Sequence, residues 1–450
     1  MFGKIKKLLS GSSNIHSLIG NILYAAFSMV LFFMMVRMLN KDLYGRWIIF
    51  ITAVSLLDML RTGLTATGAI RAISTTKGEE QYSNIAATYR LSIYSTFILS
   101  LIFIPIYFLI KDFFLDSYYL PILLFYPFLA FANLAHMQAV TYCQGIVNFK
   151  RILVIRSSIG VLNLVFMGLY ILLFDENLTG IIITYGLSDV IVSIFVIFTR
   201  WDGSRFFRYY KRENLTKILQ FGKYSTASNI GSSLLRSSDT IIISLSSVMG
   251  APAVAIYAIP LKFVEFVEIP LRSLTATAYP KLSAAYTESK EKFNEVFSLY
   301  ISYSVVVLLP LLIIIPLSAG YILHFFGGKI YADSIDLQKT ILYIIIGYIF
   351  TLPFDRYSGV ALFAFDKPEL NFKKIIVMLI SNVAFDLVAV FIFHSLELVA
   401  VATVLFTIMG IVMGWRYIYK FSGLTLSFTL KQIFRTLGYI LKSSTKLFKK

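Results

Sequence analysis

Charged residues are scarce in this chain, and it contains a single cysteine. Of its 450 residues, 14% are charged and 58% are hydrophobic, and the mean hydropathy is +0.77. With Cys143 as the sole cysteine, a disulfide within the chain is impossible and a thiolate metal site is disfavoured. Apolar stretches of membrane-spanning length recur from end to end, which no water-soluble fold requires.

Sequence motifs for nucleotide binding and for enzyme chemistry are also missing. The Gly327-Gly328-Lys329 segment lacks the first glycine and the Ser/Thr of a phosphate-binding loop. There is no zinc motif, no G-x-S-x-G elbow and no Rossmann fingerprint. No loop is long enough for a soluble domain, which a membrane polymerase or glycosyltransferase usually needs. These absences exclude an ABC transporter that works by itself and favour a transporter over an enzyme.

Long apolar segments predict an all-α polytopic membrane protein with about 12 transmembrane helices. A helix of ~20 apolar residues crosses a hydrocarbon core of ~30 Å. The predicted spans cover residues 14–38, 44–73, 86–110, 119–145, 152–174, 178–199, 218–247, 251–283, 296–325, 339–365, 372–394 and 397–421.

Basic residues fall mostly in alternate loops, which indicates the orientation of the chain. Most of the 41 lysines and arginines lie on one side of the predicted topology, which places both termini in the cytoplasm. This bias accounts for the net charge of +17 without any binding of nucleic acid.

The basic, aromatic segment 200–217 suits a cytoplasmic linker at the headgroup layer. It separates two six-helix lobes, 1–199 and 218–421. The basic segment 422–450 is predicted to be an amphipathic cytoplasmic tail on the anionic inner surface.

A short internal repeat supports the division into two lobes. The sequence LTAT occurs at Leu64–Thr67 and again at Leu274–Thr277, an offset of 210 residues. At the same offset Asp58 corresponds to Glu268, and Arg71 corresponds to Lys281. Because about six spans separate the copies, both copies have the same orientation across a membrane. The pattern is typical of a transporter built from two parallel repeats.

Twelve charged residues lie deep within the predicted spans, more than five residues from either end. Such groups are costly at membrane depth and usually face a bundle interior or a hydrated cavity, so they indicate substrate or ion paths. The competing interpretation is structural, because opposite charges three or four residues apart neutralise each other on one helix. Asp189 and Asp386 stand apart from other charges in the sequence. Each is either a proton-coupling group or a buried acid bonded to a backbone carbonyl. The twelve residues are Asp58, Arg61, Asp189, Arg236, Asp239, Lys262, Glu265, Glu268, Arg272, Asp355, Arg356 and Asp386.

Several short motifs resemble those of Wzx-type polysaccharide flippases. The first span carries Gly20 and Asn21, and Leu43-Tyr44-Gly45 opens the second. The two LTAT segments resemble the repeated second and eighth helices of the superfamily that also contains lipid II flippases and MATE drug antiporters. The resemblance implies a MATE-like fold with two six-helix lobes around a central cavity, which works by alternating access.

The resemblance also implies a cargo and its surroundings. The expected cargo is an undecaprenyl-diphosphate-linked oligosaccharide, moved from the cytoplasmic to the outer leaflet of a bacterial cytoplasmic (inner) membrane for export of a surface polysaccharide such as O-antigen. Membrane lipids, a polysaccharide polymerase and other glycan-assembly proteins are the expected partners. No cofactor is implied, and a proton or sodium gradient is the candidate energy source.

The charged residues in the spans are then the candidate site. An anionic sugar–diphosphate headgroup needs a hydrated path with cations, and five intramembrane cations are available for headgroup contact: Arg61, Arg236, Lys262, Arg272 and Arg356. Arg236, Lys262 and Arg272 are the preferred candidates. The residues predicted to balance charge or to couple an ion are Asp58, Asp239, Glu265, Glu268, Asp355 and Asp386.

Three other functions compete with this interpretation. A cation-coupled multidrug antiporter of the same fold needs carboxylates without matching cations in one lobe, and the mixed charges disfavour it. A lipid II flippase commonly has spans beyond the twelfth, and this tail is too basic to cross a membrane. A scaffold for glycan assembly that does not transport needs no intramembrane charges.

Overall fold

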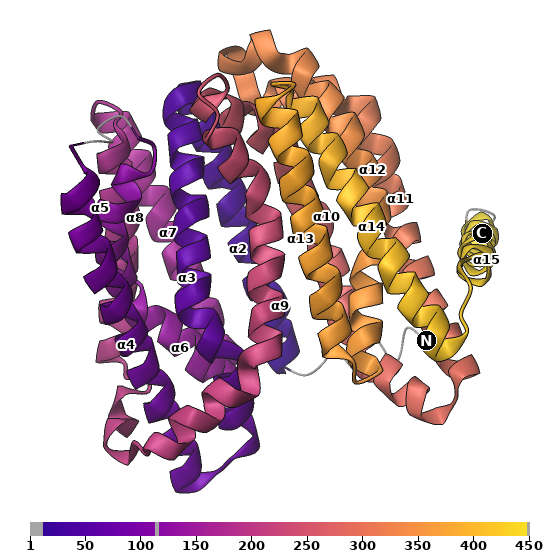
Figure 1. Ribbon diagram of the computed structural model, residues 1–450, viewed down its shortest axis with the longest axis horizontal. Helices are drawn as coiled ribbons and strands as arrows, with labels where there is room; N and C mark the ends of the chain where they lie inside the picture. Colours follow the sequence, from indigo (N-terminus) through magenta and orange to yellow (C-terminus); the bar gives the residue numbers. More distant parts are fainter. Residues whose placement is uncertain (1–11, 113–116, 448–450) are drawn as a thin grey trace. The chain divides into compact units, whose positions relative to one another are not determined.

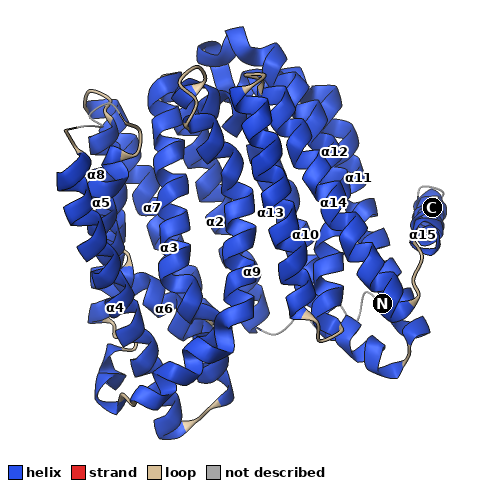
Figure 2. Ribbon diagram, viewed as in Figure 1, coloured by secondary structure: helices blue, strands red, loops and turns tan. Residues whose placement is uncertain are grey.

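The computed structural model describes residues 12–112 and 117–447, and every regular element among them is a helix (Figure 2). Residues 1–11 and 448–450, which belong to the predicted N-terminal lobe and tail, lie outside the described residues. The helical content confirms the predicted fold class. All twelve predicted spans correspond to helices, with 119–145 divided between two of them; most boundaries agree to within six residues, and α4 begins eight residues before the predicted start at 86.

Two compact units make up the chain, Met1–Ser233 and Leu234–Lys450. The boundary between them falls inside helix α9 (Arg212–Ser244) rather than in segment 200–217. The division into two six-span lobes remains a prediction.

Unit 1 consists of seven long helices, one short 3₁₀ helix and the first part of α9, among the residues described (Figure 1). Asparagine side chains fix the starts of three of them: Asn40, Asn148 and Asn177 each accept a hydrogen bond from the backbone amide three residues on. Such caps satisfy amides that have no partner within the helix. The elements are α2 (Ser12–Met38), α3 (Lys41–Thr75), α4 (Gly78–Ile110), α5 (Leu120–Ala132), α6 (Leu134–Gly145), α7 (Phe149–Leu173), α8 (Leu178–Phe198) and η1 (Ser204–Tyr209).

The basic segment 200–217 is part of unit 1 and packs in part on α4. Within it, the Phe206 ring on η1 is buried and stacks on Tyr82 of α4, with 4.4 Å between ring centroids. The Arg90 guanidinium of α4 lies 4.0 Å from the centroid of the Tyr210 ring. The aromatic residues of this segment therefore pack on α4 as well as marking a headgroup-level loop.

Unit 2 is arranged around α12, which contacts α10, α11 and α14, while α13 packs on α14. Helix α10 contains Pro260, Pro270 and Pro280 and remains helical throughout. Neighbouring helices and local adjustments can satisfy the carbonyls that such prolines free. The elements are α10 (Gly250–Glu288), α11 (Lys290–Gly327), η2 (Gly328–Ser334), α12 (Ile335–Ala364), α13 (Pro368–Phe391), α14 (Leu396–Ser422) and α15 (Leu426–Leu447).

Length and composition make seven helical stretches of the described residues suitable for crossing a membrane, or eight if the bent pair α5–α6 is one span. One stretch, Lys290–Ala364, joins α11, η2 and α12 and so covers two predicted spans. Helices α9 and α10 do not qualify; both carry charged residues in their interiors, α9 at Arg236 and Asp239. Helix α2 contributes only the shorter apolar stretch Ala25–Met38. The protein is a multi-span membrane protein, and the number of crossings remains a prediction.

Candidate functional site

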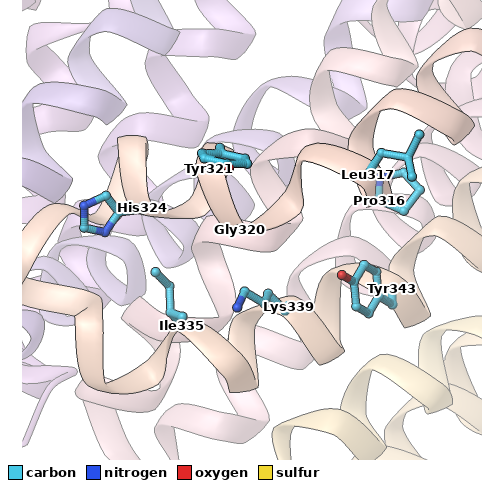
Figure 3. Close-up of a pocket in the computed structure, with 8 residues that line it drawn as sticks. All are labelled: Pro316, Leu317, Gly320, Tyr321, His324, Ile335, Lys339 and Tyr343. Carbon is cyan, nitrogen blue, oxygen red and sulfur yellow. The ribbon is translucent and has the colours of Figure 1, made fainter.

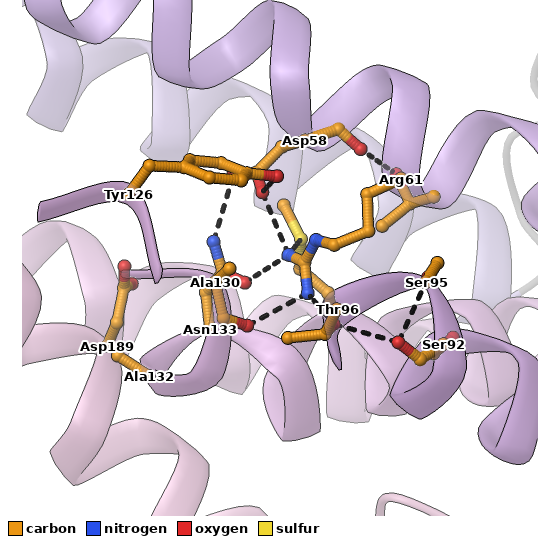
Figure 4. Close-up of polar contacts among 12 residues, drawn as sticks. Asp58, Arg61, Ser92, Ser95, Thr96, Tyr126, Ala130, Ala132, Asn133 and Asp189 are labelled. Carbon is orange, nitrogen blue, oxygen red and sulfur yellow. Dashed lines mark hydrogen bonds and ion pairs between the residues drawn. The ribbon is translucent and has the colours of Figure 1, made fainter. Parts of the chain in front are cut away.

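Unit 1 contains a buried polar network, called here the Arg61 cluster: Asp58, Arg61, Thr96 and Asn133 (Figure 4). The Arg61 side chain is only 1% exposed. Its terminal nitrogens donate to Asp58 Oδ1 and Thr96 Oγ1, each at 2.8 Å, and to the Ala130 carbonyl at 2.9 Å. A further hydrogen bond goes to Asn133 Oδ1.

A break in the helix between α5 and α6 positions this network. The two helices are bent by 49° on either side of Asn133, where one continuous span, 119–145, was predicted. Asn133 Nδ2 donates to Asp58 Oδ2 at 2.9 Å. Two carbonyls beside the break accept from side chains, Ala130 from Arg61 and Ala132 from Ser193. Side chains from α3 and α8 therefore satisfy backbone groups that lipid cannot.

A second buried pair lies close to this break. His136 Nε2 lies 3.8 Å from Asp189 Oδ1, and its Nδ1 lies 3.3 Å from Ser193 Oγ. Asp189 stands apart in the sequence, yet its carboxyl has a polar neighbour from α6. Asp58, Asn133 and the terminal nitrogens of Arg61 are thus engaged with one another, and Arg61 lies inside the unit rather than at a surface open to an anion.

Unit 2 contains a different arrangement, called here the Glu268 cluster: Arg236, Glu268, Arg272 and Arg356. Three helices contribute to it, namely α9, α10 and α12. Glu268 Oε2 lies 2.5 Å from Arg272 Nη2 and 4.0 Å from Arg236 Nη1. Its other oxygen lies 2.6 Å from Arg356 Nη2. One carboxylate therefore holds three guanidinium groups.

Exposure differs sharply between the acid and the arginines of this cluster. The Glu268 side chain is 6% exposed, whereas Arg272, Arg236 and Arg356 are 59%, 56% and 34% exposed. Three cations around one anion leave an excess of two positive charges. Because a guanidinium has five donors in a planar fork, each arginine can bind Glu268 and still offer donors to a phosphate oxygen.

Two other predicted residues are engaged in pairs of their own. Lys262 Nζ lies 2.6 Å from Glu265 Oε2, one helical turn along α10. Asp355 Oδ1 lies 2.8 Å from Lys374 Nζ of α13, and that lysine also donates to Ser358 Oγ at 3.0 Å. The Lys374 side chain is 3% exposed. Lys374 lies near the start of the predicted span 372–394 and was not among the candidate residues, so its buried pairing was missed.

Two buried acids form a third polar site in unit 2. Asp239 of α9 accepts hydrogen bonds from uncharged groups only: Tyr257 at 3.0 Å, Asn382 at 3.0 Å and Thr403 at 3.1 Å. Asp386 is fully buried and lies one helical turn along α13 from Asn382, the residue that bonds to Asp239. Within the described residues, neither Asp386 oxygen nor Asn382 Oδ1 has a hydrogen-bond partner of normal geometry. The site therefore has more acceptor oxygens than donors.

Only part of this third site was predicted from the sequence. Asp239 and Asp386 were named, but Tyr257, Asn382 and Thr403 were not. Asn382 and Asp386 are four residues apart and therefore share one face of α13, which is the signal that could have identified the pair.

A surface groove of about 490 Å³ lies between α11 and α12 (Figure 3). Its only basic side chains are His324 and Lys339, and Lys339 is paired with Asp336 at 2.9 Å. None of the charged residues predicted to form a site lines it. The lining residues are Pro316, Leu317, Gly320, Tyr321, His324, Ile335, Lys339 and Tyr343.

Comparison with solved structures identifies the class of fold. An inward-facing multidrug-resistance MATE transporter of the MOP superfamily aligns with a TM-score of 0.71 at 18% identity, over 90% of this chain and 98% of that one. A MOP superfamily transporter from Pyrococcus furiosus aligns with a TM-score of 0.62 at 18% identity, over 90% and 94% of the chains. The chain has the MATE fold, which is a fold of multi-span membrane transporters.

Sequence comparison identifies the family. The profile of the polysaccharide biosynthesis protein family matches residues 34–336, about two-thirds of the chain, and the protein belongs to that family. Comparison with curated proteins finds no match. Family and fold together confirm the resemblance drawn from the Gly20, Leu43-Tyr44-Gly45 and LTAT motifs.

Proposed function

We propose that the protein is a flippase that moves an undecaprenyl-diphosphate-linked oligosaccharide from the cytoplasmic to the outer leaflet by alternating access. The observation that carries this proposal is the Glu268 cluster, in which two exposed arginines and the half-buried Arg356 gather around one buried carboxylate. The polysaccharide biosynthesis family supports a glycan cargo, and the MATE fold supports transport.

The Glu268 cluster suits a diphosphate because of its charge and its geometry. Its excess of two positive charges offsets much of the charge of a diphosphate diester. Glu268 keeps the three guanidinium groups close together despite their mutual repulsion. Hydrogen bonds between guanidinium and phosphate are charge-assisted and frequently bidentate, so they orient the headgroup as well as attract it.

Within this proposal the five predicted cations have different roles. Arg236, Arg272 and Arg356 contact the headgroup. Lys262 is mainly engaged with Glu265 and contributes less. Arg61 is assigned to the internal network of unit 1, because its side chain is buried and its terminal nitrogens already have partners.

The coupling ion is assigned to the Asp239–Asp386 site. Two nearby carboxylates in a buried site cannot both stay ionised by themselves, so either one of them takes up a proton or a metal cation balances the pair. The unpartnered oxygens of Asp386 and Asn382 are available to such an ion. Na⁺ and H⁺ are the two candidates, and a gradient of the one that binds would drive the cycle. The remaining predicted acids, Asp58, Glu265, Glu268 and Asp355, balance neighbouring cations.

The proposed setting is a bacterial cytoplasmic membrane with both termini in the cytoplasm. Membrane lipids surround the protein there, and the proposed partners are a polysaccharide polymerase and other glycan-assembly proteins. Nucleic acid is not among them.

The decisive experiment is depletion of the protein in cells, followed by detection of the undecaprenyl-linked glycan in each leaflet. We expect a surface-polysaccharide precursor to accumulate in the cytoplasmic leaflet while peptidoglycan synthesis continues. Restoring the wild type should clear the precursor, and restoring an Arg272→Gln variant should not. Normal glycan export together with new sensitivity to cationic dyes would instead indicate a drug antiporter. Accumulation of the peptidoglycan precursor would indicate a lipid II flippase.

A further inference from the structure

Helix α15 (Leu426–Leu447) differs from the other long helices of unit 2 in direction and composition. In Figure 1 helix α15 is seen nearly end-on, whereas α13 and α14 are seen along their length, so α15 lies crosswise to them. The chain turns into it at Gly423, whose left-handed backbone (φ +71°) ends α14. A helix that lies across membrane-spanning neighbours lies close to the plane of the bilayer.

One face of α15 fixes it to unit 2. Thr429, Ile433 and Thr436 are buried and recur at steps of four and three residues, so they share one face. Thr429 Oγ1 lies 2.9 Å from Ser298 Oγ of α11, the helix on which α15 packs. Just before α15, the Ser422 carbonyl accepts from Asn294 Nδ2 at 3.1 Å.

A second face of α15 is apolar and exposed. Leu426, Leu430 and Phe434 follow one another at steps of four residues, and the Phe434 side chain is 74% exposed. At about 100° per residue, the centre of this stripe lies roughly 90° around the helix from the centre of the buried face. No described residue covers Phe434, so the stripe is open to an apolar phase beside unit 2.

A third face of α15 is basic. Lys431 and Arg435 are exposed and four residues apart, about 100° around the helix from Leu430 and Phe434 respectively. Lys442 and Lys446 continue the same spacing in the sequence, and residues 426–447 include no acidic residue. The helix therefore carries only positive charge beside its apolar stripe.

We propose that α15 is a membrane-surface helix that binds anionic phospholipid. The apolar stripe of Leu426, Leu430 and Phe434 enters the boundary between headgroups and acyl chains. The basic face of Lys431 and Arg435 binds lipid phosphates. The three faces together account for the helix: one packs on α11, one enters the lipid and one binds anionic headgroups. This combination of apolar burial and electrostatic attraction is how interfacial helices bind membranes.

Spin labels in the full-length chain test the depth of α15. With Cys143→Ala the chain has no cysteine, so Phe434→Cys and Arg435→Cys each place a nitroxide at one exposed position. In vesicles of phosphatidylcholine and phosphatidylglycerol, the label at 434 is expected to lie about 5–10 Å below the phosphates. It should collide with oxygen and be shielded from a water-soluble nickel chelate. The label at the neighbouring position 435 should be accessible to nickel. Equal access at both positions would overturn the proposal.

The lipid charge is tested with the same label at 434. Omitting phosphatidylglycerol, or introducing Lys431→Gln with Arg435→Gln, should favour the undocked helix by a factor of about five for each charge lost. Nickel access at position 434 should rise accordingly. Unchanged access would show that α15 is held by α11 and apolar contacts only, and would overturn the role of anionic lipid. Neither result depends on transport, so this proposal and the proposed flippase activity fail separately.

Discussion

Asp58 and Glu268 occupy equivalent positions in the sequence repeat, yet their arginine partners have opposite surroundings. Asp58 pairs with Arg61, three residues along α3, and the arginine is buried. Glu268 pairs with Arg272, four residues along α10, and the arginine is more than half exposed. A shift of one residue rotates a side chain by about 100° around a helix. The acid at this repeat position therefore anchors an internal network in unit 1, as Asp58, and a more exposed cluster of cations in unit 2, as Glu268.

This difference shows how a duplicated element can separate stability from binding. In unit 1 the arginine bonds to a broken helix, a threonine and an acid, and none of its terminal nitrogens remains without a partner. In unit 2 the buried acid is shared by three arginines, two of which are more than half exposed. Substitutions in unit 1 should therefore lower the stability of the fold, whereas substitutions in unit 2 should lower transport.

The largest effect is expected for Arg61→Met. The substitution leaves the buried Asp58 carboxylate and the Ala130 carbonyl without their donor, and breaking a buried pair in this way costs about 3–5 kcal/mol of unfolding free energy. Thermal unfolding in detergent measures it. The matched control is Arg272→Met, which removes an exposed partner and should change stability by less than about 1 kcal/mol. Similar losses for both variants would contradict the contrast between the two units.

Arg272→Gln is expected to impair transport more than stability. Hydrogen bonds to charged groups contribute about 1.5–3 kcal/mol, so the rate of glycan flipping should fall about 10- to 100-fold. Reconstituted vesicles with a leaflet-resolved assay measure the rate, and thermal unfolding verifies the fold. Arg236→Gln and Arg356→Gln should act in the same direction. Unchanged flipping in all three variants would remove the Glu268 cluster from the headgroup path.

Asp386→Asn should uncouple transport from the ion gradient. The amide cannot take up a proton or balance the charge of a metal cation, so flipping driven by a gradient should fall to the rate without a gradient. If about 1.4 kcal/mol of coupling free energy is lost, this fall is about tenfold. Assays with an H⁺ gradient only or an Na⁺ gradient only identify the ion. Glu265→Gln, which alters an exposed acid, is the control. If both variants keep the full response, the Asp239–Asp386 site does not couple the ion.

Lys262→Gln is expected to have the smallest effect. Its pairing with Glu265 spans one helical turn and one partner is exposed, so its loss should cost about 0.2–0.5 kcal/mol of stability. Flipping should change less than in Arg272→Gln. A loss of transport as large as that of Arg272→Gln would extend the headgroup path along α10 to this lysine.

Much of the fold was predictable because hydropathy reports membrane burial directly. All twelve predicted spans correspond to helices. The break at Asn133 was not predicted, because a few polar residues such as Asn133 and His136 are compatible with a continuous span, and the break depends on Arg61 and Ser193 from other helices. The packing of Phe206 onto Tyr82 was missed for a similar reason, since aromatic and basic residues also suit a headgroup-level loop.

The candidate sites were predictable only as lists of charges. The sequence named Glu268 and its three arginines, but their meeting at one carboxylate depends on how α9, α10 and α12 pack. Local spacing suggested the pair Asp58–Arg61 correctly, yet it gave no sign that Arg61 would be buried. Lys374 shows the opposite error, because its position near the end of a span concealed its burial and its bond to Asp355.

The hydrogen bonds at Asn133 also constrain the evolution of this sequence. Asn133 contacts both Asp58 and Arg61, and each of these depends on the other two. Losing any one leaves polar groups in a region that lipid and protein cannot solvate, so single changes at these positions should rarely persist. Among relatives of this chain we expect residues 58, 61 and 133 to be inherited as a set and replaced together.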